Sequence, residues 1–121
     1  MAINGTPAIA KLKSFRTLRD GWHYGRGGPI SSDVIGQAES IHAFYLSVGF
    51  SLTDFFPGAN GEVLATAYHK DHYIDVIIEP DGSHSLVYEV ANKEIICIDG
   101  SDLKTIENSI LSFRARSGAS D

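Results

Sequence analysis

The residues with the most suggestive chemistry are His69, Asp71 and His72, which lie together in the segment His69-Lys70-Asp71-His72. Neutral imidazole nitrogens and carboxylate oxygens are ligands that zinc and other transition metals take in proteins. The flanking sequence predicts a hairpin that turns at Lys70-Asp71, which places the two histidines opposite each other and supplies only two ligands. The candidates for a third ligand are Asp75, Glu79 and His84. We favour a polar hairpin tip with solvated histidines, and the alternative is a metal-binding or metal-dependent catalytic site.

A second candidate is the segment Gly25-Arg26-Gly27-Gly28, which precedes a predicted helix. The backbone N–H groups of a glycine-rich turn, the positive end of the helix and the Arg26 side chain could together hold a phosphate or a carboxylate. The spacing, however, matches neither the dinucleotide fingerprint nor the P-loop, and no strand precedes the turn. We favour the alternative that the glycines let the chain fold tightly around Trp22.

Aromatic and basic side chains in two predicted loops are the candidate partner-binding residues. The first loop has the tryptophan, tyrosine and arginine content that protein interfaces favour. The second loop has two adjacent phenylalanines before Pro57-Gly58, which form either an exposed apolar hook or a core residue beside one that covers a sheet edge. The predicted partner-binding residues are Trp22, Tyr24, Arg26, Phe55 and Phe56.

The sequence contains no complete catalytic signature. No Gly-x-Ser-x-Gly motif occurs, and spacing alone assembles no Ser/His/Asp set. The single cysteine, Cys97, lies in the apolar run Ile95-Ile96-Cys97-Ile98 and is predicted to be a small buried hydrophobic residue rather than a reactive thiol. We therefore expect a protein that is not an enzyme and that has no cofactor.

The composition indicates an ordinary soluble globular chain with a mildly acidic character. Hydrophobic residues make up 43% of the 121 residues, and the formal net charge is -5. Negative charge disfavours binding to a phosphate backbone, so we expect another protein or a small molecule as the partner, and not nucleic acid. No apolar stretch approaches the roughly 20 residues that cross a bilayer. The N-terminal sequence has no secretory signal and one cysteine allows no disulfide within the chain, so we expect a cytoplasmic protein.

The candidate residues are positioned by a predicted antiparallel meander. Strand-like runs at 62–69, 72–79, 83–91 and 94–99 are separated by turns so short that only antiparallel neighbours are allowed. The turn segments are Lys70-Asp71, Pro80-Asp81-Gly82 and Asn92-Lys93. Alternation predicts one apolar face with Ile74, Val76 and Ile78, and one mixed face with Tyr73, Ile77 and Val87. An open edge of this sheet could pair with a second copy to form a homodimer.

Three helices complete the predicted fold. Apolar residues at helical spacing predict helices over 9–18, over 34–48 and from 103 to 113. The second helix has cap residues at Ser31, Ser32 or Asp33 and ends at Gly49, and the third is capped by Ser101 or Asp102. Residues 50–61 are predicted to be a connection, and residues 1–8 and 117–121 to be flexible. The predicted fold is a single α+β domain over 1–121, a three- to four-stranded antiparallel meander with helices packed on one face, in the order α-α-β-β-β-β-α.

Several short motifs together resemble a group of small uncharacterised bacterial proteins. The motifs are Leu18-Arg19-Asp20-Gly21-Trp22, the glycine and proline loop with the helix after it, Phe56-Pro57-Gly58, Gly61-Glu62 and Asp81-Gly82. In that group, a Gly-Trp segment and a Pro-led helix precede a two- or three-stranded meander with an Asp-Gly turn. The resemblance spans roughly Leu18 to Val90 and implies a bacterial or phage protein of the mobile-gene pool, sometimes encoded near toxin-antitoxin or defence genes. It implies no catalytic residues.

These observations together predict a small protein-binding module that is not an enzyme. The absence of an assembled active site in the sequence and the aromatic loop at Trp22 and Tyr24 motivate this prediction. Within the setting that the resemblance implies, such a module would be an accessory, inhibitor or antitoxin-type component.

Overall fold

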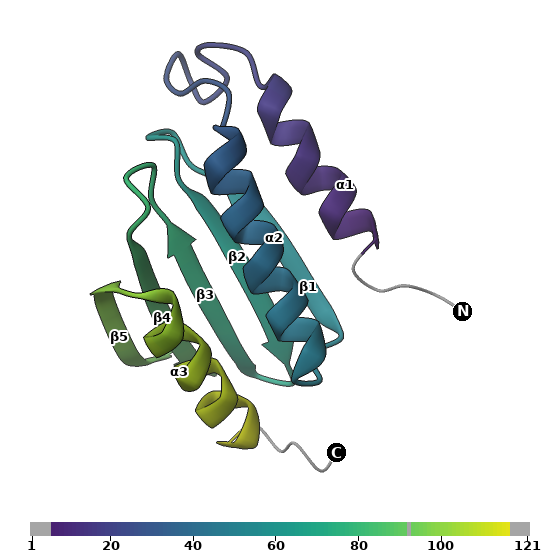
Figure 1. Cartoon of the computed structure of the whole chain (residues 1–121), viewed down its shortest axis with the longest axis vertical. Helices are drawn as coiled ribbons and strands as arrows, with labels where there is room; N and C mark the ends of the chain where they lie inside the picture. Colours follow the sequence, from purple (N-terminus) through teal and green to yellow (C-terminus); the bar gives the residue numbers. More distant parts are fainter. Residues whose placement is uncertain (1–5, 92, 117–121) are drawn as a thin grey trace.

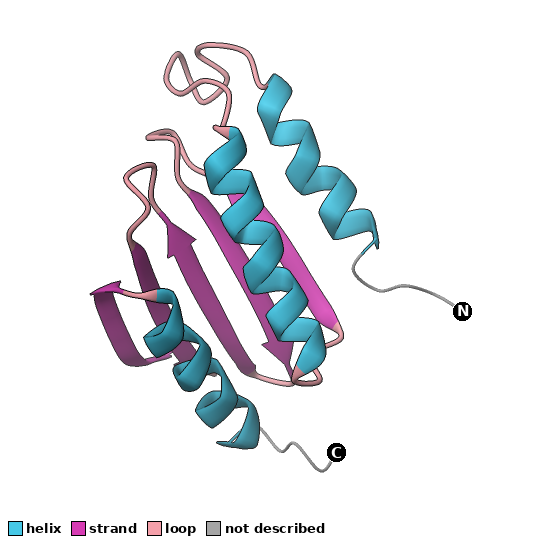
Figure 2. Ribbon diagram, viewed as in Figure 1, coloured by secondary structure: helices cyan, strands magenta, loops and turns pink. Residues whose placement is uncertain are grey.

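The computed structural model describes residues 6–91 and 93–116, which form helices packed on one face of a five-stranded antiparallel sheet (Figures 1 and 2). The elements in chain order are α1 Thr6–Ser14, the 3-10 helix η1 Phe15–Thr17, α2 Ser32–Ser47, β1 Leu52–Pro57, β2 Val63–His69, β3 His72–Ile78, β4 His84–Val90, β5 Lys93–Ser101 and α3 Leu103–Arg116. Each strand pairs with its neighbour in sequence, in the order β1-β2-β3-β4-β5. The predicted α+β class, the meander and the order of the helices are confirmed.

The sheet has one strand more than the sequence predicted. Residues 50–61 were expected to be a connection, but β1 lies within them and pairs with β2, from Leu52 opposite Tyr68 to Pro57 opposite Val63. Proline cannot donate to a sheet ladder and is tolerated on an edge strand, which is the position β1 occupies. Pro57 and the charged Asp54 therefore make β1 hard to recognise in the sequence, although an edge strand tolerates both residues.

The first helix begins earlier than predicted, at Thr6 and not at Ile9. Pro7 lies in its first turn, where the missing N–H of proline breaks no intrahelical hydrogen bond. Residues 6–8 are thus helical, whereas the sequence predicted them to be flexible. The other segments predicted to be flexible, 1–5 and 117–121, lie outside the described residues, as does the turn residue Asn92.

Helix α2 begins and ends at residues that the sequence identifies. The Ser31 hydroxyl accepts a hydrogen bond from the backbone N–H of Val34 at 3.2 Å, which satisfies one of the free N–H groups of the first turn. Gly49 follows the last turn with φ of +101°, a conformation that favours glycine.

Helix α3 is capped as predicted, but its buried stripe is shorter. The Asp102 carboxylate accepts from the backbone N–H of Thr105 at 2.8 Å. Leu103 was expected in the apolar stripe and is instead 39% exposed, because it is the first helical residue and lies beyond the sheet-facing turns. The buried residues of α3 are Ile106, Ile110, Phe113 and Arg114.

The core lies between the helices and one face of the sheet. The predicted apolar face of β3 is confirmed, since Ile74, Val76 and Ile78 are all buried. Helix α2 buries Tyr45 against this face, and the Tyr45 hydroxyl donates to the backbone carbonyl of Ala65 in β2 at 2.8 Å. The bond removes the cost of burying an unpaired hydroxyl and ties the helix to the central strands.

Replacing Tyr45 by Phe should lower the free energy of unfolding by about 1 kcal/mol, because the hydrogen bond to Ala65 is lost while the ring remains. Urea denaturation followed by circular dichroism measures the change. The control is Tyr24→Phe, since Tyr24 is 95% exposed and should tolerate the loss of its hydroxyl without effect. Equal stability of the Tyr45→Phe protein and the unmodified protein would contradict this role for the buried hydroxyl.

Candidate functional site

The candidate site is the face of the sheet that no described helix covers (Figure 1). The strand register arranges its side chains in three rows that run across the sheet, and we call these rows together the open face. The first row is Phe56, Leu64, Ile77 and Ser85. The second row is Asp54, Thr66, Asp75, Val87 and Cys97. The third row is Leu52, Tyr68, Tyr73, Glu89 and Glu94.

The open face combines apolar surface with negative charge. Leu52 is 63% exposed and Phe56 is 39% exposed, and Leu64, Ile77 and Val87 are half-buried. Four carboxylates lie among them, at Asp54, Asp75, Glu89 and Glu94. The predicted mixed face with Tyr73, Ile77 and Val87 is therefore present. Clustered apolar side chains on the surface of a small protein are typical of an interaction site.

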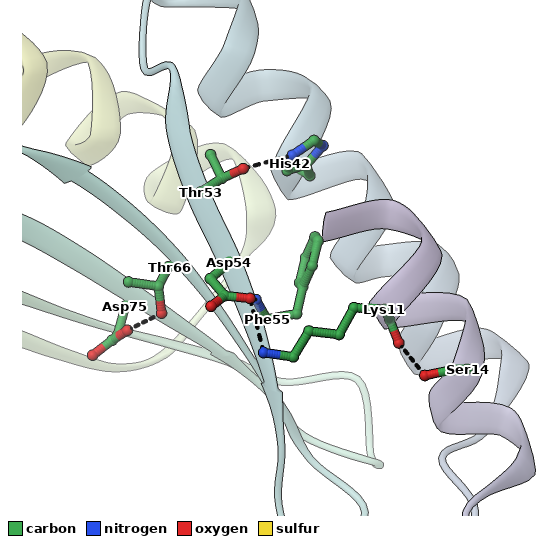
Figure 3. A network of polar contacts seen from close by, with 8 residues as sticks. All are labelled: Lys11, Ser14, His42, Thr53, Asp54, Phe55, Thr66 and Asp75. Carbon is green, nitrogen blue, oxygen red and sulfur yellow. Dashed lines mark hydrogen bonds and ion pairs between the residues drawn. The ribbon is translucent and has the colours of Figure 1, made fainter. Parts of the chain in front are cut away.

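Hydroxyl groups hold the central carboxylates in place. The Thr66 hydroxyl donates to Asp75 Oδ1, and the Tyr73 hydroxyl donates to Glu89 Oε1 at 2.5 Å. The rings of Tyr68 and Tyr73 lie side by side, with centroids 6.0 Å apart. Figure 3 shows Thr66 and Asp75 on the side of the sheet away from α2. We call Tyr68, Tyr73, Asp75 and Glu89 the acidic-aromatic cluster.

The pKa values of Tyr73 and Asp75 in the cluster are both raised. The hydrogen bond to Glu89 is the main reason that the pKa of Tyr73 is raised to about 12, since it favours the protonated phenol. Partial burial is the main reason that the pKa of Asp75 is raised, and the nearby Glu89 raises it further. The pKa of Tyr73 is thus raised mainly by its bond to Glu89, and that of Asp75 mainly by burial.

Lys11 forms an ion pair with Asp54 at the edge of the open face. Its side chain reaches from α1 past the edge strand, and Nζ lies 2.9 Å from Asp54 Oδ1 (Figure 3). The same Nζ lies 4.4 Å from the centroid of the Phe56 ring, within the range of a cation–π contact. The same Asp54 oxygen accepts from the backbone N–H of Phe55 at 2.8 Å. These contacts cover part of the free edge of β1.

The two adjacent phenylalanines point to opposite faces of the sheet. Phe55 has no exposed surface and packs against the ring of His42, with centroids 5.3 Å apart. The prediction that Phe55 binds a partner is therefore wrong, because strand alternation turns it into the core. Phe56 lies on the open face and is accessible to a partner.

The loop around Trp22 is a small hairpin and not an irregular segment. His23 and Arg26 form a bridge, and Tyr24 and Gly25 between them both have positive φ, as a tight hairpin turn requires. Tyr24 projects from the tip and is 95% exposed. The predicted partner-binding residues Tyr24 and Arg26 are thus accessible, but they lie in the α1–α2 loop and not on the open face.

The glycines of this loop serve the packing of Trp22. The indole Nε1 donates to the carbonyl of Gly28 at 3.0 Å, and a Cβ added at Gly27 would lie only 2.7 Å from Nε1. Two N–H groups of the predicted anion cradle are also used within the loop, because those of Gly25 and Arg26 donate to the carbonyls of Gly21 and His23, both at 3.0 Å. The structure therefore supports the favoured interpretation over anion binding.

The two histidines of the predicted metal site face each other across β2 and β3, as expected. His72 Nδ1, however, lies 2.6 Å from the Tyr88 hydroxyl, and its Nε2 lies 3.6 Å from Asp71 Oδ1. Among residues 6–91 and 93–116, no group of three or more His, Cys, Asp or Glu side chains could hold a metal ion. The proposed ligand set of His69, Asp71 and His72 is therefore not supported.

Cys97 is exposed, which corrects the prediction that it is buried. It lies on the edge strand β5, opposite Val87 and on the side that no helix covers. Local desolvation and the carboxylates of Asp99 and Glu94 raise the pKa of its thiol. A raised pKa keeps the thiol protonated, which is the opposite of what an activated nucleophile needs.

Sequence reasoning missed the contribution of β1 and β2 to the open face. Tyr68 and Thr66 were not singled out, and Phe56 was assigned to a loop. The alternation of 64, 66 and 68 against buried neighbours is the signal that could have found the β2 residues. The β1 residues could be assigned to the open face only from the pairing of β1 with β2.

Comparisons with protein-family models, with curated proteins and with solved structures give no match for this chain. Within the described residues, no helix has the length and apolar character needed to cross a membrane.

Replacing Glu89 by Gln should lower the pKa of Tyr73 from about 12 toward the ordinary value of 10.0, because the amide carries no charge to oppose phenolate formation. Carbon-13 NMR of ring-labelled tyrosine, recorded as a function of pH, measures this pKa. Glu107→Gln on α3 removes the same charge from the helical side and should leave the value unchanged. A Tyr73 pKa that stays the same in the Glu89→Gln protein would refute the hydroxyl–carboxylate pair.

Proposed function

We propose that this chain is a non-enzymatic protein-binding module that contacts its partner through the open face. The observation that supports this most strongly is a five-stranded sheet with all described helices on one side and aromatic, apolar and acidic side chains on the other. A sheet that served only as a scaffold would present mainly polar groups to water on its uncovered side.

The size of the open face suits a protein partner. Five strands spaced about 4.8 Å apart, of which β1 to β4 have six or seven residues and β5 has nine, span roughly 24 Å by 20 Å. A standard protein interface buries about 800 Å² on each partner, with an apolar centre and a polar rim. The open face and its immediate surroundings therefore provide the area and the chemistry of the central part of such an interface.

The open face is also preorganised for binding. Its side chains project from paired strands, and the hydroxyls of Thr66 and Tyr73 already hold the carboxylates of Asp75 and Glu89. Because these groups are ordered before a partner arrives, binding costs less conformational entropy than it would for a flexible loop. Binding without bond-making is the mode of action that an inhibitor, an antitoxin or an accessory protein needs.

The biological setting of this module stays a prediction that the sequence resemblance alone supports. In that setting the chain would neutralise or assist another protein of a bacterial mobile element or defence system. Self-association through an open edge of the sheet also stays a prediction; of the two edge strands, β1 is covered in part by Lys11.

The double variant Tyr68→Ser/Ile77→Ser should reduce recovery of the native partner about tenfold or more, because it removes an aromatic and an apolar group from the centre of the open face. The measurement is affinity capture from the source organism with quantitative mass spectrometry. The comparison variant is Tyr24→Ser/Arg26→Ser, which alters the other accessible candidate surface at the α1–α2 loop. Thermal unfolding of all three proteins establishes that each is folded.

Recovery that falls only for the sheet variant supports the open face as the binding site. Recovery that falls only for the loop variant would move the site to the hairpin tip at Tyr24. Unchanged recovery with both folded variants would reject both surfaces.

A further inference from the structure

We infer that the partner presents an arginine side chain to the acidic-aromatic cluster, where its guanidinium pairs with Asp75 and Glu89 and stacks on the tyrosine rings. This inference rests on the proposed function, because it names the chemistry that the open face recognises. It follows from the geometry of the cluster, from the absence of a described cation beside these two carboxylates, and from a smaller version of the same contact elsewhere on the open face.

The register brings the four groups of the cluster together. Tyr73 lies directly opposite Tyr68 on one side and opposite Glu89 on the other. Asp75 lies opposite Val87, so Glu89 is its diagonal neighbour on the adjacent strand, a separation that long side chains span. Two negative charges and two aromatic rings thus border one small area of the surface.

Hydroxyl groups orient both carboxylates without neutralising them. Asp75 receives its hydrogen bond from Thr66, and Glu89 receives its hydrogen bond from Tyr73, each on a single oxygen. No cation among the described residues forms an ion pair with either carboxylate. Oriented carboxylates that have hydrogen bonds but no counter-charge are suited to a cation from outside the chain.

The contact at Lys11 shows how this surface binds a cation. Lys11 Nζ lies 2.9 Å from the Asp54 carboxylate and 4.4 Å from the Phe56 ring centroid. A carboxylate beside an aromatic ring is thus already occupied by a cation at the edge of the open face. The cluster repeats this combination at the centre with two carboxylates and two rings.

Arginine fits the cluster better than lysine does. A guanidinium is planar, presents several N–H donors in a fixed fork, and stacks on aromatic faces, whereas an ammonium is a compact and strongly hydrated point charge. The apolar neighbours Ile77 and Val87 reduce the water around the site, which favours the more weakly hydrated cation. The negative charge of the cluster disfavours a phosphate-bearing partner, so the recognised surface belongs to a protein.

The test uses capped hexa-arginine and hexa-lysine peptides as probes, added at low ionic strength to nitrogen-15-labelled full-length protein. Hexa-arginine should shift the amide signals of the cluster and its neighbours, and it should bind several-fold more tightly than hexa-lysine. The double variant Asp75→Asn/Glu89→Gln should bind hexa-arginine about tenfold more weakly, which corresponds to about 1.4 kcal/mol. Both substitutions preserve shape and remove repulsion, so the melting temperature should not fall.

The matched control is Asp33→Asn/Glu107→Gln, which removes the same net charge from α2 and α3. It should bind hexa-arginine as the unmodified protein does. An equal loss of affinity in the control would show that binding depends only on net charge and would overturn the inference. Equal binding of the two peptides would overturn the choice of arginine, and signal shifts away from the open face would overturn the site.

A second measurement separates this inference from the proposed function. The Asp75→Asn/Glu89→Gln protein is carried through the same affinity capture as the Tyr68→Ser/Ile77→Ser protein. Loss of the native partner in both supports an arginine contact. Loss in the Tyr68→Ser/Ile77→Ser protein alone would leave the open face as the binding surface and reject the arginine.

Discussion

The packing of α2 against β2 and β3 is the interaction on which the rest of the structure depends. Its stripe of apolar residues, which includes Ile41 and Tyr45, is fully buried on the sheet. Small residues at Ala65 and Ala67 on β2 let the helix approach closely, and the Tyr45 hydroxyl bonds to a strand carbonyl there. Side chains alternate along a strand, so a helix fixed on one face determines which residues of every strand remain on the other.

This constraint explains why the charged and aromatic residues of the sheet gather on one side. A carboxylate such as Asp75 would lose most of its hydration beneath α2, and the strand register places it on the opposite face beside Thr66. The helix side therefore stabilises the fold, and the other side is free to carry negative charge. The edge strand β1 serves both sides, with Phe55 in the core and Asp54 paired with Lys11.

Much of the fold could be predicted from the sequence because its signals are local. Short turns define the meander, and hydroxyl and carboxylate caps define the ends of α2 and α3. The strand β1 could not be predicted in this way, since proline and aspartate interrupt its pattern and the polar Thr53 on its inner side finds its partner in a distant residue, His42 Nε2, at 2.8 Å. The open face depends on register across all strands, which no local pattern contains. Cys97 looked buried because apolar neighbours surround it in sequence, but an edge strand leaves it exposed.

The close approach of Gly27 to the indole has a practical consequence for spectroscopy. Trp22 is the only tryptophan of the chain, and it is fixed by its bond to the Gly28 carbonyl in the connection between α1 and α2. Its intrinsic emission consequently senses the integrity of that connection, while chromophores on the sheet surface are tyrosines. Because the indole can be excited at wavelengths that tyrosine hardly absorbs, the emission of Trp22 follows this connection separately from the tyrosines, which include Tyr24 in the same connection.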